Sequence, residues 1–373
     1  MAKNPLLALQ EFGQSVWYDN IRRGLISSGE LARLIAEDGL RGVTSNPTIF
    51  AKAIAGSDDY DEAITRLSSQ KLEIAEIYER LAIEDIRLAA ELFRPIYEES
   101  EGQDGLISLE VSPLLAQLTE ETVAEAKRLF RLVDRPNVLI KVPATPAGIS
   151  AVEQLLREGI NVNITLMFSL AHYEAVTEAY LRGLEARARN GEPLARVSSV
   201  ASFFVSRVDT AVDRALEQLD AAGARHAVPL QGKIAIANSK LVYRRFREIF
   251  TGARFQALAE QGARPQRVLW ASTSTKNPAY SDVRYVAELI GPDTVNTVPP
   301  VTLNAFRDHG RVRGVTIEEE LAGAGEAVEE LARLGIDLDQ ITEQLQRDGV
   351  QAFASSYHQL LASLSEKLRH KES

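Results

Sequence analysis

One lysine lies in the middle of an apolar β-branched run, where a charged side chain is unexpected. Lys141 belongs to the run 138–142, whose other members are Val, Leu, Ile and Val. Removal from water favours the neutral amine, the form of a lysine that attacks a carbonyl carbon. This setting predicts Schiff-base chemistry at Lys141. The structural alternative is a salt bridge to Glu110 that holds two neighbouring strands together.

Polar side chains recur at every second position of several other apolar runs. Ser108 and Glu110 alternate with apolar residues in one run, Asn163 and Thr165 in another, and Ser202 in a third. Burying such groups without partners costs a few kcal/mol each. The alternation therefore predicts a polar cavity on one side of each strand and helices packed on the other. For a single Ser or Asn, capping of a nearby backbone group remains the alternative.

These residues require a scaffold of alternating strands and helices. Such alternation favours parallel strands, and eight units favour a (β/α)8 TIM barrel, whose chemistry lies at the carboxyl ends of the strands. Extra helices are expected over about 59–99, broken near Pro95, and a capping box at Thr316 is expected to open a helical tail over about 316–371, with turns near Gly335 and Gly349. The whole chain, 1–373, is expected to be one domain. The predicted strands are 15–17, 42–45, 106–111, 138–142, 160–167, 197–205, 268–272 and 295–298.

Composition narrows the function further. The net charge of −10 argues against nucleic-acid binding, which needs clustered Lys and Arg. The chain has no Cys, and its five His show no metal-ligand spacing, so no metal or other cofactor is expected. No run suits a signal peptide or a membrane span, which predicts a cytoplasmic protein without a membrane partner. The sequence does not give the oligomeric state, and a homodimer is one possible assembly.

Four segments together resemble the transaldolase family, in the order and at the spacing typical of that family. The resemblance spans roughly residues 12–306 and is similar to the longer bacterial subfamily. It implies a barrel enzyme that transfers a dihydroxyacetone unit from a ketose phosphate to an aldose phosphate in the pentose phosphate pathway. The segments are 44–50 (TSNPTIF), 138–145 (VLIKVPAT), 161–169 (NVNITLMFS) and 202–209 (SFFVSRVD).

The resemblance also implies roles for individual residues. Lys141 would form the Schiff base with fructose 6-phosphate or sedoheptulose 7-phosphate, and Asp19 would take the hydroxyl proton that triggers carbon–carbon cleavage. Glu110 and Thr165 would hold a water that shuttles protons. Glyceraldehyde 3-phosphate or erythrose 4-phosphate would accept the three-carbon unit. The substrate-binding residues implied are Asn46, Asn163 and Ser202 for the dihydroxyacetone unit, Phe204 as a wall and Arg207 for the phosphate.

One segment departs from the family pattern. After the seventh strand the family commonly has an Arg in a Ser-Phe-Arg-Asn context, whereas this chain has ASTSTKN at 271–277. We assign the second phosphate contact to Lys276, with Ser274 as a helper, although a salt bridge at the rim would equally explain this lysine.

Three other functions remain open at this stage. A class I aldolase that releases free dihydroxyacetone would use the same lysine and barrel, but classical aldolases resemble one another in carrying it on the sixth strand rather than the fourth. A non-catalytic phosphosugar-binding barrel would not need Lys, Asp and Glu together. A purely structural barrel would show no exchange when a ketose phosphate is added.

Overall fold

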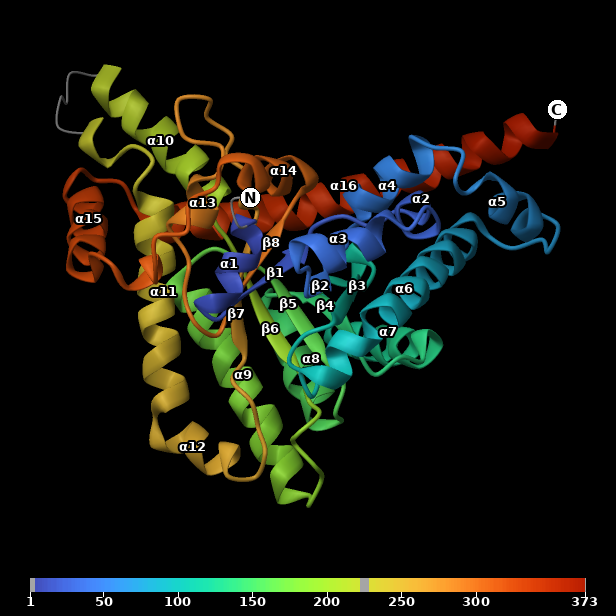
Figure 1. Ribbon diagram of the computed structural model, residues 1–373, viewed down its shortest axis with the longest axis horizontal. Helices are drawn as coiled ribbons and strands as arrows, with labels where there is room; N and C mark the ends of the chain where they lie inside the picture. The colour runs from blue at the N-terminus through green and yellow to red at the C-terminus, as the bar shows by residue number, and fades with distance from the viewer. Residues whose placement is uncertain (1–3, 222–227, 373) are drawn as a thin grey trace.

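The computed structural model describes residues 4–221 and 228–372. Its centre is a closed parallel barrel in which each strand pairs with the next and the eighth returns to the first (Figure 1). The predicted (β/α)8 barrel is therefore confirmed, and each predicted strand overlaps an observed one. The strands are β1 Gln14–Tyr18, β2 Gly42–Val43, β3 Leu106–Glu110, β4 Val138–Pro143, β5 Val162–Met167, β6 Ser199–Phe204, β7 Arg267–Ala271 and β8 Thr294–Val298.

Helices surround the barrel and supply the apolar layer against its outer face. The extra helices expected over about 59–99 are present as α5 and α6, and α4 precedes them. The α-helices are α1 Pro5–Glu11, α2 Arg23–Ser27, α3 Glu30–Asp38, α4 Pro47–Ala55, α5 Asp61–Ser68, α6 Ile74–Glu99, α7 Thr119–Val133, α8 Pro146–Arg157, α9 Leu170–Arg189, α10 Ser206–Ala221, α11 Ile234–Thr251, α12 Ala253–Ala259, α13 Arg284–Ala287, α14 Pro300–His309, α15 Leu321–Arg333 and α16 Leu338–Glu372. Short 3₁₀ turns occupy η1 Pro113–Leu115, η2 Val228–Leu230 and η3 Thr316–Glu318.

The interior of the barrel is polar at both ends. At the amino ends of the strands, Arg267 forms an ion pair with Asp104 at 2.9 Å, and both side chains bond to the Ser15 hydroxyl. Trp17 packs on the same side and lies 3.4 Å from Asp104 through its indole nitrogen. This paired cluster closes one end, so the cavity that the strand alternation predicts opens at the carboxyl ends.

Two helix breaks expected from the sequence do not occur. Helix α6 continues through Pro95, because this proline costs one backbone bond in the last turns of a helix whose face, including Phe93 and Tyr97, is buried. Helix α16 continues through Gly349, which lies at a close approach to the barrel. A Cβ at Gly349 would sit 2.8 Å from the Leu166 side chain, so glycine here allows contact rather than a turn.

The capping box expected at Thr316 is also wrong. Thr316 lies in the 3₁₀ turn η3, and α15 begins only at Leu321. The Thr316 hydroxyl donates to the carbonyl of Ala287 at 2.8 Å and accepts from the N–H of Ile290 at 3.0 Å. Its side chain therefore closes the loop after α13 and is not available to cap a helix. The turn expected near Gly335 is confirmed, since that glycine has φ of +81° between α15 and α16.

Within the described ranges, 4–221 and 228–372, no helix combines the length and the apolar character that crossing a membrane requires.

Candidate active site

A cavity of about 220 Å³ opens at the carboxyl ends of the strands. Eight of the ten residues that the sequence singled out line it, and the other two, Glu110 and Asn163, bond directly to its lining residues. The eight come from β4, β5 and β6, from the loops that follow β1, β2 and β7, and from the first turn of α10. The eight are Asp19, Asn46, Lys141, Thr165, Ser202, Phe204, Arg207 and Lys276.

Lys141 and Glu110 form a buried pair on adjacent strands. The register of β3 and β4 places them directly opposite each other, and Lys141 Nζ lies 3.3 Å from Glu110 Oε2. Their side chains are only 6% and 5% exposed. Nζ also donates to the carbonyl of Ser45 at 3.2 Å. Burial raises the pKa of Glu110 above its usual value, and the nearby Lys141 charge opposes this rise.

Asp19 follows β1 and lies at the junction of the first and last strands. Its N–H donates to the carbonyl of Val298, and its Oδ1 accepts from the hydroxyl of Thr44 at 2.7 Å. Thr44 in turn lies 2.6 Å from the hydroxyl of Thr297 on β8. Burial raises the pKa of Asp19, while Thr44 and the Lys141 charge oppose the rise. The pKa of the Asp19 carboxyl group is therefore higher than that of an exposed aspartate.

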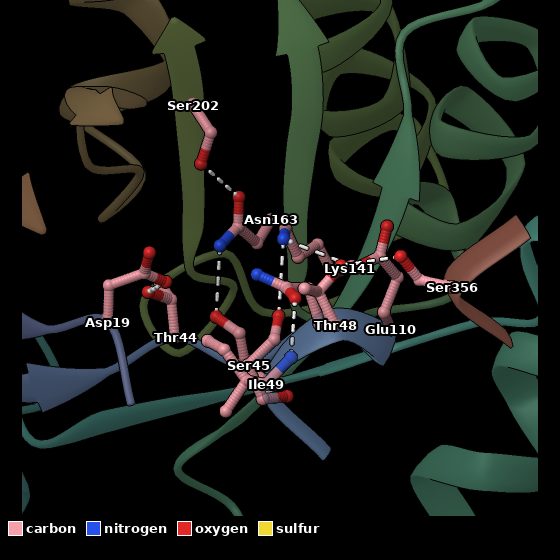
Figure 2. A network of polar contacts seen from close by, with 12 residues as sticks. Asp19, Thr44, Ser45, Thr48, Ile49, Glu110, Lys141, Asn163, Ser202 and Ser356 are labelled. Carbon is pink, nitrogen blue, oxygen red and sulfur yellow. Dashed lines mark hydrogen bonds and ion pairs between the residues drawn. The ribbon is translucent and has the colours of Figure 1, made fainter. Parts of the chain in front are cut away.

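A row of hydrogen bonds crosses the barrel beside the lysine (Figure 2). The Ser202 hydroxyl donates to Asn163 Oδ1 at 2.6 Å, and Asn163 Nδ2 donates to the Ser108 hydroxyl at 2.9 Å. The amide of Asn163 is thus held in one orientation from both ends. Asn46 is the N-cap of α4, where its side-chain oxygen accepts from the N–H of Ile49 at 3.0 Å.

Thr165 is buried, and its hydroxyl has no hydrogen-bond partner among residues 4–221 and 228–372. The next residue, Leu166, has φ of +62°, a conformation uncommon for a residue with a side chain. The pairing of β5 with β6 also shifts register between Ile164 and Met167. Strain and irregular pairing of this kind gather at functional sites. They occur here at the strand end that carries the unpartnered hydroxyl.

Two cations stand on one side of the cavity. Arg207, in the first turn of α10, stacks over the ring of Phe204, with its guanidinium carbon 5.2 Å from the ring centre. Lys276 lies in the loop after β7 and donates to the hydroxyl of Ser274. Burial lowers the pKa of both cations, and Arg207 lowers that of Lys276 further. Neither forms a salt bridge with any carboxylate in the described part of the chain, so the rim salt bridge considered for Lys276 is absent there.

The chain is similar in sequence to known proteins over nearly its whole length. A family profile described as Transaldolase/Fructose-6-phosphate aldolase matches residues 16–364. The chain belongs to this family. Among similar relatives, a transaldolase of Thiobacillus denitrificans is 50% identical, with 95% of this chain and 98% of the relative covered. A transaldolase of Saccharopolyspora erythraea is 48% identical, with 97% of both chains covered. One of Trichodesmium erythraeum is 46% identical, with 99% of both covered.

Sequence reasoning missed the part of the site that α16 provides. Phe353 lines the cavity, and its ring centre lies 5.4 Å from Lys141 Nζ. Gln346 donates to the carbonyls of Ala144 and Leu166, both at 3.0 Å. No local sequence pattern distinguishes these two residues, because a Gln on the surface and a Phe in the core are both ordinary in an amphipathic helix. Gly349 could have indicated a close approach between this helix and the barrel.

Three polar residues that the sequence did not single out also line the cavity. Thr44 and Thr297 line it beside Asp19, and Ser272 lines it just after β7. Ser272 has φ of +55° and lies 3.0 Å from the Ser206 hydroxyl. A search for hydroxyl residues at strand ends would have found all three. Among the described residues, no group of three or more His, Asp or Glu is arranged to hold a metal ion.

Proposed function

We propose that the protein is a transaldolase that moves a dihydroxyacetone unit from a ketose phosphate to an aldose phosphate through an imine on Lys141. The donors would be sedoheptulose 7-phosphate or fructose 6-phosphate, and the acceptors glyceraldehyde 3-phosphate or erythrose 4-phosphate. The observation that carries the proposal is one enclosed lysine amine, paired with Glu110, inside a cavity that also holds Asp19 and two cations without a salt bridge among the described residues.

In the proposed reaction, Lys141 Nζ attacks the ketone carbon of the donor, and the resulting carbinolamine loses water to give the imine. Glu110 lies within reach of Nζ and has a raised pKa, which suits a group that accepts and returns a proton. The unpartnered hydroxyl of Thr165 is free to hold the water that leaves and re-enters. Both residues would act at the steps that form and hydrolyse the imine.

Asp19 would act at the carbon–carbon bond. As a base it would take the proton of the hydroxyl adjacent to that bond, so that the bond breaks, the aldose phosphate leaves and an enamine of dihydroxyacetone stays on Lys141. The same carboxyl group would return the proton as the enamine attacks the acceptor aldehyde. Its raised pKa supports this exchange, because an acid–base group works best when its pKa lies near the working pH.

The remaining predicted residues would bind the substrate. Asn46, Asn163 and Ser202 would hold the hydroxyls of the three-carbon unit, and Phe204 would form a wall. Arg207 offers the planar fork that binds a phosphate through two hydrogen bonds, and Lys276 adds a point charge. The absence of a salt-bridge partner for either cation in the described chain supports a ligand with negative charge.

The family description also names an aldolase, which is the alternative retained here. An aldolase would form the same enamine, but water would then release free dihydroxyacetone. Product analysis with and without an acceptor separates the two: a transaldolase consumes fructose 6-phosphate appreciably only when an acceptor such as erythrose 4-phosphate is present. A non-catalytic phosphosugar-binding barrel would bind the sugar and form no imine.

The proposal includes a cytoplasmic location and a homodimer. Light scattering after size-exclusion chromatography would test the homodimer.

Borohydride trapping tests the proposal directly. Reduction in the presence of fructose 6-phosphate should attach a three-carbon unit to Lys141, located by peptide mass mapping. Lys240→Met is the matched control, because Lys240 is the second buried lysine of the described chain and donates only to a backbone carbonyl on the outer layer. That variant should label as the natural chain does, and Lys141→Met should not label. A label on another lysine, or none, would overturn the assignment.

A further inference from the structure

One face of α16 closes the mouth of the barrel. Gln346, Gly349, Phe353 and Ser356 follow at intervals of three, four and three residues, which places them along one side of the helix. In Figure 1, α16 runs across the molecule past α4 toward the C-terminus, and it packs against α4, α5, α6, α10 and β5. The helix is therefore a wall of the cavity rather than an appendage.

The contacts of this face hold the helix to the strands that carry the chemistry. Gln346 bonds to the carbonyl of Ala144, just after β4, and to that of Leu166 on β5. Farther along, the hydroxyl of Thr48 on α4 donates to Ser356 at 2.8 Å (Figure 2). Phe353 lies between these two anchors and is 6% exposed. Its position over Lys141 is thus set from both sides.

We propose that Phe353 shields the substrate-bearing Lys141 from water and thereby sets how often the dihydroxyacetone unit is transferred rather than released. This inference rests on the proposed function. The ring centre lies 5.4 Å from Nζ, within the range of a cation–π contact, which stabilises a positively charged nitrogen out of water. A protonated imine carries its charge at this nitrogen, so the ring favours the covalent intermediate.

The shielding acts on a reaction that consumes water. After cleavage, Lys141 holds the enamine, in which the former C3 carbon is the nucleophile. Transfer forms a bond from this carbon to the acceptor aldehyde. Release instead adds a proton to the carbon and a water oxygen to the adjacent imine carbon, and the carbinolamine then breaks to free dihydroxyacetone and the lysine amine. Phe353 covers the nitrogen side of this centre, so removing its ring admits the water that release needs.

Two substitutions at this position separate bulk from aromatic character. Phe353→Ala removes both, and Phe353→Leu keeps apolar bulk without the ring face. We expect dihydroxyacetone released per transfer event to rise about tenfold in Phe353→Ala, because the lost bulk admits water, and by less in Phe353→Leu, which keeps most of that bulk. Phe353→Tyr, which keeps the ring, should restore the natural ratio. The matched control is Phe255→Leu, a buried aromatic substitution in the α12 cluster far from the cavity.

A variant outside position 353 tests the same inference. Gly349→Ala keeps the ring but places a methyl 2.8 Å from the Leu166 side chain, so Leu166 or α16 must move at the mouth and the release ratio should rise in the same direction. If Phe353→Ala does not fold, Phe353→Leu and Gly349→Ala carry the test, with thermal unfolding as the check on folding.

The outcomes separate this inference from the proposed function. If the natural chain forms no imine at Lys141, the proposed function fails first and this inference with it. If the natural chain traps and transfers normally but the folded variants keep its release ratio, the shielding role is overturned alone. Equal losses of trapping, transfer and release would also overturn it, because they would show that Phe353 only holds the helix in place.

Discussion

Replacing Lys141 should leave Glu110 as a buried carboxylate without its ion-pair partner, and the protein should become less stable as a result. In Lys141→Met the side-chain volume is kept while the ion pair at 3.3 Å is lost. Breaking a buried pair by removing one partner costs about 3–5 kcal/mol. Unfolding entropy of about 2.1 cal/mol/K per residue over 373 residues gives about 1.3 °C per kcal/mol, so Tm should fall by about 4–6 °C at pH 8.

The loss should depend on pH in one direction. Burial already raises the pKa of Glu110, and removing Lys141 removes the charge that opposes this rise. A carboxyl group with a raised pKa in the folded state contributes stability below its unfolded value and loses it as pH rises through its folded value. Asp19 is affected in the same sense, because Lys141 also lowers its pKa. The variant should therefore be least stable at pH 8 and approach the natural chain as pH falls toward 5.

Thermal and urea unfolding at pH 5, 6, 7 and 8 would measure this. The double variant Lys141→Met with Glu110→Gln is the control, because it removes both charges and should recover most of the stability lost at pH 8. A loss in Lys141→Met of equal size at every pH would show that packing, not charge, is responsible. No loss at pH 8 would show that the pair is not held as the structure has it.

Three further predictions concern the other charged residues of the cavity. Asp19→Asn should unfold at a higher temperature than the natural chain at pH 8, because burial raises the pKa of Asp19 and the neutral amide avoids a buried charge; the difference should vanish below about pH 4, where unfolded Asp is protonated. The same variant should still trap the imine at Lys141 while turnover falls by roughly 10²-fold, and turnover at the natural rate would refute its role. Arg207→Ala and Lys276→Ala should each raise KM for fructose 6-phosphate by about tenfold or more while sparing free fructose, whereas Lys276→Arg should retain most activity. Steady-state kinetics on both sugars checks this, and equal losses on both would assign the residue to the fold.

The residues on the strands were predictable because a strand has a local period. Side chains alternate between two faces, so Lys141, Asn163 and Ser202 could be assigned to the interior from their neighbours alone. Parallel register then aligns strand ends, which explains why Glu110 meets Lys141. Such arguments need only a few consecutive residues and the rule that adjacent strands in the chain lie side by side.

The contribution of α16 could not be predicted in this way, because it depends on which surface the helix meets. Gly349 and Pro95 both read locally as helix breakers, yet packing outweighs the cost of each. The bonds of Gln346 to Ala144 and Leu166 join residues 202 and 180 positions apart. The sequence pattern over a few helical turns cannot identify partners so distant in the chain. The capping box predicted at Thr316 was wrong for the same reason, because the Thr316 hydroxyl bonds to residues near the end of α13.

Asp19 lies where β1 meets β8, the contact that closes the barrel. The site residues therefore differ in how much of the barrel must form before each is in place. Lys141, Glu110 and Asn163 come from three consecutive strands, β3 to β5, so neighbouring chain segments can assemble them. Asp19 instead depends on the meeting of β1 with β8, and the supporting pair Thr44 and Thr297 joins residues 253 positions apart. The ring must close before this carboxyl group is in place. Under the proposed mechanism, a barrel with that one seam open would keep Lys141 and Glu110 for imine formation and would lack Asp19, the proposed base for cleavage. Catalytic turnover would then report closure of the whole barrel, whereas imine formation would report only part of it.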